Sequence, residues 1–414
     1  MRTTKTFTLM LLSGVASVAL IGQASALEAQ SFIDRLTAVY KSVGYDLEFG
    51  AATLDGDVIT VDGVTVGLIG YDKDVKPMHF DTELTFSGVS EQAGGAYRAD
   101  SLTIPDIETE FASEPKGELS LKDIAVSDLY VPGGDTVPAI ATLQLIGAIS
   151  TGPLSVLRDG VEVMAYDSFE AASDFTPSQG SAELEELSSS MNIAGIMADL
   201  STFSEEDPEA GAVIEALGLT NISGDISQDL TWSMADGHMT LNQFLLDFAD
   251  IGALDLTAEV TGLTPAVLEQ INAMQANMAA DGEMTEEKAQ AQMMSGMAIM
   301  QGVSIVGASV RYDDASLAGK LLDFFAAQSG ADRATFVAGL KSMLPAIIAE
   351  SGIPALNDVV IPPVEAFLDN PESLEIRIAP PNPTSALVLM AAAANPAGLI
   401  KALGLVVEAN TPAE

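Results

Sequence analysis

The stretch LSLKDIAV, Leu119–Val126, has the alternating pattern of a β-strand with one irregular step. Its apolar residues alternate as far as Leu121. The next apolar residue, Ile124, comes three positions later instead of two, and the alternation then continues to Val126. Because successive side chains of a strand point to opposite faces, such a step would turn all later apolar side chains to the wrong face. Some irregularity of the backbone near Asp123 must therefore absorb one residue.

The same six-residue pattern recurs along the chain. Its first, third and sixth positions are apolar, the second is Ser or Thr, the fourth is any residue, and the fifth is Asp, Gly or Gln. The six copies start at Ile59, Leu84, Leu102, Leu119, Met239 and Val303. A two-residue hairpin turn suits Asp62-Gly63, whereas Pro105-Asp106 and Lys122-Asp123 suit it poorly. A β-bulge bends a strand and restores its phase. We expect a bulge or bend in most copies and leave Asp62-Gly63 open between the two.

The phrases lie in successive segments with strand-like alternation, separated by turns rich in Gly, Asp and Pro. This pattern predicts an α+β fold, built on a curved, mainly antiparallel β-sheet with bulged strands. We expect helices to cover the sheet and the C-terminal part to be rich in helix. Two short strands are expected within that part, at 373–380 and 405–410.

Helical segments are predicted from apolar periodicity and from cap residues. One helix is expected over 31–43, and Thr264 with Pro265 starts another that runs toward Ala280. The other predicted helices are 181–200, 208–218, one starting at Thr285, 316–330, 332–352, 353–371, 385–396 and 396–404.

The division of the chain follows this alternation of strands and helices. Residues 1–26 form a signal peptide, 27–176 a β-rich part with a leading helix, and 177–310 a β-rich continuation with inserted helices. Residues 311–414 form the mostly helical C-terminal part.

The N-terminus has the three regions of a secretory signal peptide. Arg2 and Lys5 precede the apolar stretch 7–22, and the small residues Ala24-Ser25-Ala26 follow it. We therefore expect cleavage between Ala26 and Leu27 and export to the periplasm. An uncleaved anchor is the alternative, but the apolar stretch is shorter than the roughly 20 residues of a bilayer span. After cleavage, no stable transmembrane insertion is expected.

Composition excludes several functions. The chain has a net charge of −42 and no cysteine. The charge would repel phosphate backbones, which excludes nucleic acid as a partner. Without cysteine there is neither a disulfide nor a thiolate nucleophile.

Motifs that would identify a reaction are missing. His79 and His238 do not belong to an HExxH motif, and the sequence has no P-loop, GxGxxG or GxSxG. The acidic groups, such as Asp55-Gly56-Asp57, do not form an EF-hand loop. We therefore expect no catalytic residues, no metal site and no cofactor.

The predicted helices after Thr264 are rich in methionine. A soft-metal site or an adaptable apolar surface would use such residues, but no Cys or His is nearby to complete a copper site. We favour a packing role, in which methionine fills irregular core space between the helices. The residues are Met274, Met278, Met284, Met293, Met294, Met297 and Met300.

An exported β-rich protein without catalytic motifs suggests that a lipid or other apolar ligand binds on the apolar face of the sheet. The alternative is a structural or adaptor protein of the cell envelope that contacts other envelope proteins. A hydrolase without a recognisable motif ranks behind both. The candidate apolar-face residues are Ile59, Val61, Leu84, Phe86, Leu102, Ile104, Leu119, Leu121, Met239 and Leu241.

The phrases LSLKDIAV, ITVDGVTV and LTIPDIET resemble strand phrases of AsmA-like envelope proteins and related uncharacterised proteobacterial periplasmic proteins. The likeness covers about residues 45–130 and 220–262, with an echo at 303–312. It implies a long curved sheet with a hydrophobic groove and a role in moving lipid between membranes. This chain departs from the group in its shortness, in the expected loss of an N-terminal anchor and in its helical C-terminal part. Those departures put membrane bridging in doubt and leave soluble lipid binding as the implied function.

Overall fold

The structure is a computed structural model that describes residues 27–69, 77–113, 115–134, 137, 139–142, 145–177, 184–202, 207–279, 286–350, 352–393 and 396–412. The expected signal peptide, residues 1–26, lies outside the described residues. Cleavage after Ala26 therefore stays a prediction.

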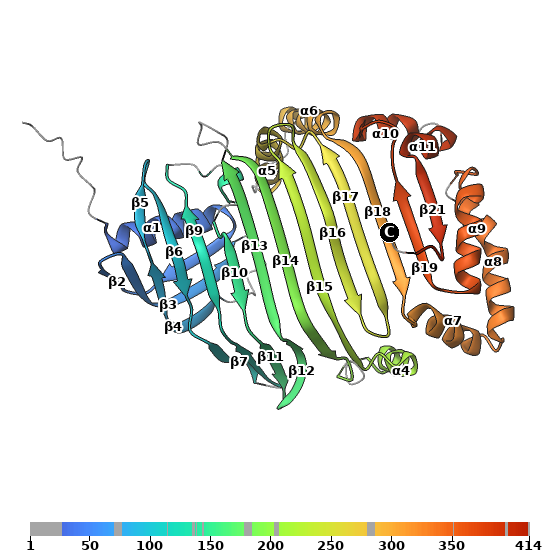
Figure 1. Cartoon of the computed structure of the whole chain (residues 1–414), viewed down its shortest axis with the longest axis horizontal. Coiled ribbons are helices and arrows are strands. Elements are labelled where there is room, and N and C mark those ends of the chain that lie inside the picture. Colours follow the sequence, from blue (N-terminus) through green and yellow to red (C-terminus); the bar gives the residue numbers. More distant parts are fainter. Residues whose placement is uncertain are drawn as a thin grey trace, which may run out of the picture.

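The strands join in a single sheet, and every pairing among the described residues is antiparallel (Figure 1). The strands are β1 Tyr45–Phe49, β2 Ala52–Asp55, β3 Val58–Leu68, β4 Met78–Ser87, β5 Ser90–Gln92, β6 Ala96–Thr103, β7 Ile107–Ser113, β8 Lys116–Leu121, β9 Ala125–Val131, β10 Ala148–Thr151, β11 Leu154–Arg158, β12 Val161–Tyr166, β13 Ser168–Pro177, β14 Leu184–Asp199, β15 Asn221–Ser233, β16 His238–Phe248, β17 Gly252–Thr261, β18 Ser304–Asp314, β19 Ser373–Ile378, β20 Thr384–Ser385 and β21 Leu405–Ala409.

The strand order follows the order of the strands along the chain, with some strands left out of the main row. Both β1 and β2 pair with β3. The order then runs β3, β4, β6, β9, β10, β13, β14, β15, β16, β17, β18, β19 and β21. A second ladder, of β7, β8, β11 and β12, joins the sheet again at β14.

The break in LSLKDIAV separates β8 from β9, which confirms the predicted bend at Asp123. Asp123 has φ of 52°, in the left-handed region that Asp tolerates better than most residues. Its backbone N–H donates to Oδ1 of Asp106, in the neighbouring break, at 3.0 Å. On the other side, the N–H of Gly152 donates to the carbonyl of Lys122 at 2.9 Å. The three breaks lie side by side, so neighbouring strands bend together.

The other copies of the phrase also contain a bulge or break. Within β3, the register against β4 shifts between Asp62 and Val64, so Asp62-Gly63 is a bulge and not a hairpin turn. In β16 the register against β17 shifts between Leu241 and Phe244. These irregularities curve the sheet, as expected for bulged strands.

The helices lie mainly around the ends of the strands and of the sheet (Figure 1). They are α1 Ala29–Ser42, α2 Ala139–Thr142, α4 Pro208–Leu217, α5 Pro265–Ala279, α6 Glu286–Gly302, α7 Leu317–Gln328, α8 Arg333–Glu350, α9 Leu356–Asp369, α10 Ala386–Ala393 and α11 Pro396–Leu403. In Figure 1, α5, α6, α10 and α11 follow one end of the strands, named here the upper rim, and α4 and α7 lie at the other, the lower rim. At the ends of the sheet, α1 packs on β1, β2 and β9, and α9 packs on β19 and β21.

The helix predicted over 181–200 is wrong, because Leu184–Asp199 is the long strand β14. Glu, Leu, Met and Ala favour a helix in isolation, but such propensities are weak against tertiary contacts. Here β14 is held along its length by ladders to β13 and β15. The segment 208–218 does form a helix, α4.

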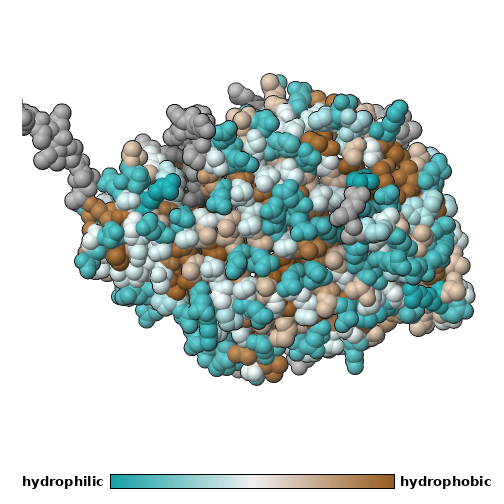
Figure 2. Space-filling view, viewed as in Figure 1, coloured by the Kyte–Doolittle hydropathy of each residue, from teal (hydrophilic) through white to brown (hydrophobic). Residues whose placement is uncertain are grey.

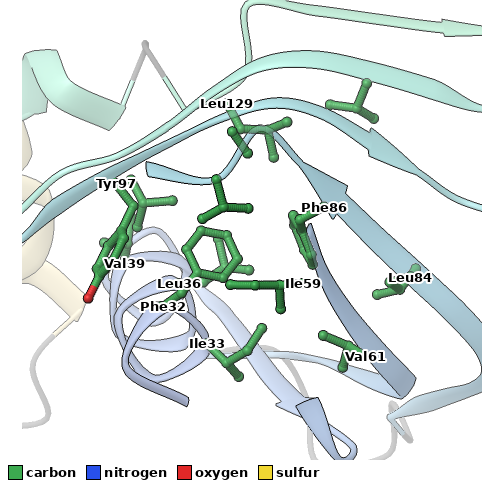
Figure 3. Close-up of a cluster of buried hydrophobic side chains, with 14 residues drawn as sticks. Phe32, Ile33, Leu36, Val39, Ile59, Val61, Leu84, Phe86, Tyr97 and Leu129 are labelled. Carbon is green, nitrogen blue, oxygen red and sulfur yellow. The ribbon is translucent and has the colours of Figure 1, made fainter. Parts of the chain in front are cut away.

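The main core lies between α1 and the N-terminal strands (Figure 3). Phe32 of α1 is completely buried and makes edge-to-face contacts with Phe86, at 5.0 Å between ring centroids, and Tyr97, at 5.5 Å. Figure 3 shows Phe32 and Leu36 turned from the helix toward the strand side chains. The apolar stripe of α1 therefore covers one end of the sheet's apolar face.

The expected divisions at 176 and 310 fall within strands of the same sheet. Residue 176 belongs to β13, which pairs with β14 across the division. Residue 310 belongs to β18, which pairs with both β17 and β19. The expected parts therefore share one continuous sheet.

Candidate apolar binding site

The cross-strand register aligns apolar side chains in one row that extends from β3 to β21. Residues paired directly across an antiparallel ladder project to the same face of the sheet, so the row identifies one face. Among its members, Gln228 is the polar exception. The apolar row consists of Ile59, Phe86, Leu102, Val126, Ile149, Ala171, Met191, Gln228, Phe244, Leu256, Val310, Ile376 and Val407.

Cover over this row is uneven. At the β3 end, Ile59 and Phe86 are buried beneath α1, at 0% and 1% exposure. Toward the other end, Val310 and Ile376 are 43% and 47% exposed. The apolar face is thus core at one end and open to solvent at the other.

A cavity of about 300 Å³ lies where the cover of α1 ends. This volume is at the low end of the roughly 300–1,000 Å³ of small-molecule sites. Helix α1 contributes one wall, and strands between β1 and β10 with two of their connections contribute the rest. The lining residues are Leu36, Tyr40, Leu47, Phe49, Val64, Val66, Phe80, Thr82, Leu84, Phe86, Leu102, Ile104, Ile107, Val126, Leu129, Ile146 and Ile149.

The lining contains no charged side chain, and its polar side-chain groups are the hydroxyls of Tyr40 and Thr82. Burial raises the pKa of Tyr40, and neighbouring Tyr45 raises it further. The phenol of Tyr40 is therefore neutral at physiological pH. Its ring meets that of Tyr45 edge to face, with centroids 6.3 Å apart, and Tyr45 is 43% exposed. An apolar molecule in this cavity would meet no charge that must be desolvated.

The structure brings several of the candidate apolar-face residues together at this cavity. Leu84, Phe86, Leu102 and Ile104 line it. Ile59 and Val61 belong to the adjoining core, and both are completely buried.

The other candidates lie elsewhere on the same face. Leu121 of β8 pairs directly with Ile107, which lines the cavity, and Leu119 lies two residues away on that strand. Met239 packs on a smaller core around Trp232, and Leu241 pairs with Leu230 beside the apolar row. These residues are not part of the cavity.

Sequence reasoning missed several lining residues, although their signals are present. Phe80, Thr82, Leu84 and Phe86 alternate along one strand, so Phe80 could have been included. Val64 follows the bulge in β3 and could be assigned to a face only once that bulge was known.

A second hollow, of about 530 Å³, lies over β16 to β19 and has a polar lining that includes Asp255, Thr257, Ser309 and Arg311. Asp255 and Arg311 alternate with the row residues Leu256 and Val310, so their side chains project to the opposite face.

In the second hollow, Arg311 has structural partners. Its Nε and Nη2 donate to Asp313 at 2.7 and 2.6 Å, and Nη2 also donates to the carbonyl of Thr411 at 2.7 Å. The hydrogen bonds to Asp313 are the main cause that raises the pKa of Arg311. The guanidinium thus ties β18 to Thr411, two residues after the end of β21.

Neither histidine lies in a metal-ligand cluster. Nδ1 of His79 is 2.9 Å from Oγ1 of Thr65, and Nε2 of His238 is 2.7 Å from Oε1 of Glu259. In the part of the chain that the structure describes, no group of three or more His, Cys, Asp or Glu side chains is arranged to hold a metal ion. Within the same residues, no helix is long and apolar enough to span a membrane.

The packing role expected for the methionines is wrong for three of them. Met293, Met294 and Met297 of α6 are 66%, 65% and 41% exposed, so they do not fill a core. The sequence pattern did not reveal this, because methionine is frequent both in cores and on binding surfaces. The side chains of Met278 and Met284 lie outside the described part.

Comparison with known proteins adds one match. A family model described as "Uncharacterized protein" matches residues 245–410, from within β16 to the residue after β21. No curated protein matches the chain. The matched part includes the helices of the upper rim but not the cavity beneath α1.

Proposed function

We propose that this protein is an exported, non-enzymatic protein of the periplasm that binds or carries a lipid or another apolar ligand in cell-envelope maintenance. The observation that carries the proposal is the cavity of about 300 Å³ with an uncharged, almost entirely apolar lining. Hydrophobic pockets with few polar groups are typical of small-molecule sites. The resemblance of its strand phrases to those of AsmA-like envelope proteins supports the same function.

The open end of the apolar row also supports this proposal. Beyond Ile149 the row leaves the core beneath α1, and its far members Val310 and Ile376 are exposed. An alkyl chain that begins in the cavity could therefore continue along the same face without meeting a charge in the row. Burying such a chain yields about 0.8 kcal/mol per CH₂ group.

Binding can be tested with the chain that begins at Leu27 and a fluorescent fatty-acid analogue. We expect saturable binding and displacement by unlabelled fatty acid. Ile104→Trp and Val66→Phe enlarge lining side chains, so each should weaken binding by about ten-fold through loss of cavity volume. Organic extraction of protein purified from an envelope fraction, followed by mass spectrometry, should identify a bound lipid.

Ile347→Trp is the matched control, since it enlarges an exposed side chain on α8 that belongs neither to the cavity lining nor to the apolar row. It should bind the analogue within about two-fold of the unmodified chain. Absence of lipid from the extract together with absence of binding would refute the proposal and favour an adaptor role. Equal weakening in all three variants would place the ligand outside the cavity.

A further inference from the structure

Gln228 of β15 is the polar exception in the apolar row. Its direct neighbours across the two ladders are Met191 and Phe244, and Ile226 and Leu230 lie two residues away on the same strand. Side chains at these positions project to one face of the sheet. The amide of Gln228 therefore lies among four apolar side chains, where it marks a point for hydrogen bonding.

Two serines lie on the same face beside Gln228. Ser189 pairs with Leu230, so it is the diagonal neighbour of Gln228 across the β14–β15 ladder, at a separation of about 7–8 Å that a long side chain can span. Ser173 pairs with Ser189, and its hydroxyl donates to the hydroxyl of Ser189 at 3.5 Å. We name Ser173, Ser189 and Gln228 the polar cluster.

The fold leaves the hydrogen-bonding groups of the Gln228 amide unused. Among the described residues, its side chain makes no hydrogen bond, and it is partly exposed. An amide offers two N–H donors and a carbonyl acceptor, and a serine hydroxyl both donates and accepts. The polar cluster thus provides neutral donors and acceptors without a charged group.

The polar cluster lies next to the cavity on the same face of the sheet. Ile149 lines the cavity and pairs with Ala171, which is two residues from Ser173 on β13. Gln228 lies three ladders beyond Ile149, about 14 Å away at a strand spacing of roughly 4.8 Å. An amphiphile with its alkyl end in the cavity can therefore place its polar group at this cluster.

The chemistry of the cluster favours a neutral polar group over an ionised one. The apolar row contains no cationic side chain to pair with a carboxylate, and an unpaired charge is costly to move from water onto an apolar face. The chain has a net charge of −42, and Figure 2 shows hydrophilic side chains spread over the whole face in view, so an anion is also repelled.

An ester or an alcohol can use the donors and acceptors of the cluster without bringing a charge. A hydrocarbon that covered Gln228 would leave its amide unpaired and desolvated, which is unfavourable. The ligand should therefore present a neutral hydrogen-bonding group at this point.

We propose that the polar cluster binds the ester group of an acylglycerol-type lipid whose alkyl chain occupies the cavity. The inference rests on the proposed function and specifies its ligand. Gln228 acts as a specificity-determining residue, because it pairs with the neutral ester and offers no charge to the carboxylate of a free fatty acid.

Displacement of the fluorescent fatty-acid analogue at pH 8 tests the ligand class on the chain that begins at Leu27. A monoacylglycerol should displace the analogue at a concentration at least about five-fold lower than a fatty acid of equal chain length requires, because its ester is neutral. Lysophosphatidylcholine contains the same ester with a zwitterionic head group. Displacement as strong as that by the monoacylglycerol would assign recognition to the ester alone, and weaker displacement would assign it to the ester with a free glycerol.

Gln228→Met retains the length of the side chain and removes its hydrogen-bonding groups. It should weaken monoacylglycerol binding by about five-fold, as expected for the loss of one neutral hydrogen bond. It should not lower the urea midpoint of unfolding, because the amide has no hydrogen-bond partner in the described part of the chain. Gln228→Lys adds a cation and should reverse the preference, so that the fatty acid becomes the stronger competitor.

Gln243→Met is the matched control. Gln243 lies on the neighbouring strand next to Phe244, so its side chain projects to the opposite face. This variant should bind both competitors as the unmodified chain does.

Equal displacement by the monoacylglycerol and the fatty acid would overturn this inference and leave the proposed ligand site in place. Undiminished monoacylglycerol binding by Gln228→Met would do the same. A lowered urea midpoint of Gln228→Met with an unchanged ligand preference would assign Gln228 to stability alone, which also overturns the inference. If the unmodified chain does not bind the analogue, the proposed function fails and this inference fails with it.

Discussion

At the scale of the residue, Asp and Gly recur as partners where neighbouring strands bend. Gly195 of β14 has φ of 67°, and a Cβ built on it would lie 2.2 Å from the carboxylate of Asp167, in the break between β12 and β13. The N–H of Gly195 donates to Oδ1 of Asp225 at 2.8 Å. A Cβ at Gly152 would similarly lie 2.8 Å from the carboxylate of Asp123. Glycine provides the close approach, and Asp accepts the N–H groups that a bend leaves unpaired.

A second feature at this scale is the phenol of Tyr312, which links β18 to Ile251 in the turn before β17. Its hydroxyl oxygen lies 2.7 Å from the carbonyl oxygen of Ile251 and 2.8 Å from Oδ1 of Asp314, and both atoms are hydrogen-bond acceptors. Burial is the main cause that raises the pKa of Tyr312, and Asp314 raises it further. The folded protein thus keeps this proton to higher pH than the unfolded chain does.

Tyr312→Phe should lower the free energy of unfolding by about 1–2 kcal/mol at pH 8, because the carbonyl of Ile251 and the carboxylate of Asp314 lose the one hydroxyl proton that they share. A raised phenol pKa stabilises the fold fully below about pH 10, and this contribution is lost as the pH rises toward the folded-state value. The difference between the two proteins should therefore shrink above about pH 10. Urea titrations at several pH values measure it, and a difference that grows with pH would contradict the assignment.

At the scale of the element, strand β14 shows how bends connect distant segments. It pairs with β13 and β15 along most of its length and also with β12, beyond the bend at Gly195. Its register against β15 shifts between Ile193 and Ile196. One strand therefore joins the main sheet to the second ladder, and its bend determines how the two meet.

Gly195→Ala should lower the free energy of unfolding by about 1–2 kcal/mol, since an L side chain in the left-handed region costs about that much. Displacement of Asp167 would add to the loss. Chemical denaturation measures the change. Gly296→Ala is the control, because Gly296 lies within α6 with nothing within 4 Å of its Cβ position, and it should be neutral or stabilising. Equal effects of the two changes would show that the bend does not require glycine.

At the scale of the whole molecule, acidity and an open apolar face coexist. The chain carries 59 acidic and 17 basic residues, and its ion pairs include contacts such as Lys41 with Asp46 at 3.5 Å. Exposed pairs of this kind contribute little to stability. Mutual repulsion of the carboxylates should therefore dominate the response of the fold to salt.

Raising the NaCl concentration from about 0.01 M to about 1 M should raise the thermal midpoint of unfolding, because the Debye length falls from about 30 Å to about 3 Å. Differential scanning calorimetry measures the midpoint. Sodium sulfate at equal ionic strength should give a larger increase, since it also strengthens apolar burial. A midpoint that does not change with NaCl would show that repulsion between carboxylates is not limiting.

Much of the fold could be predicted from short-range pattern, and the site only in part. The irregular phrase predicted a bend at Asp123, and the apolar stripe of residues 31–43 predicted α1. For 181–200, helix-favouring composition gave the wrong element, because pairing with β13 and β15 outweighs local propensity. Leu84 and Phe86 were predicted for the apolar face, whereas their meeting with Leu36 in one cavity depends on long-range packing.

The sequence by itself determined the α+β class, the curvature of an antiparallel sheet and the acidity of its surface. These follow from the local alternation of side chains, from bend residues such as Asp123, and from composition. Only the tertiary structure decided that one apolar row extends from Ile59 to Val407, that α1 covers one end of it above a cavity, and that Met293 faces solvent. Those properties depend on register between strands far apart in the chain and on which helix packs where, and a local pattern contains neither.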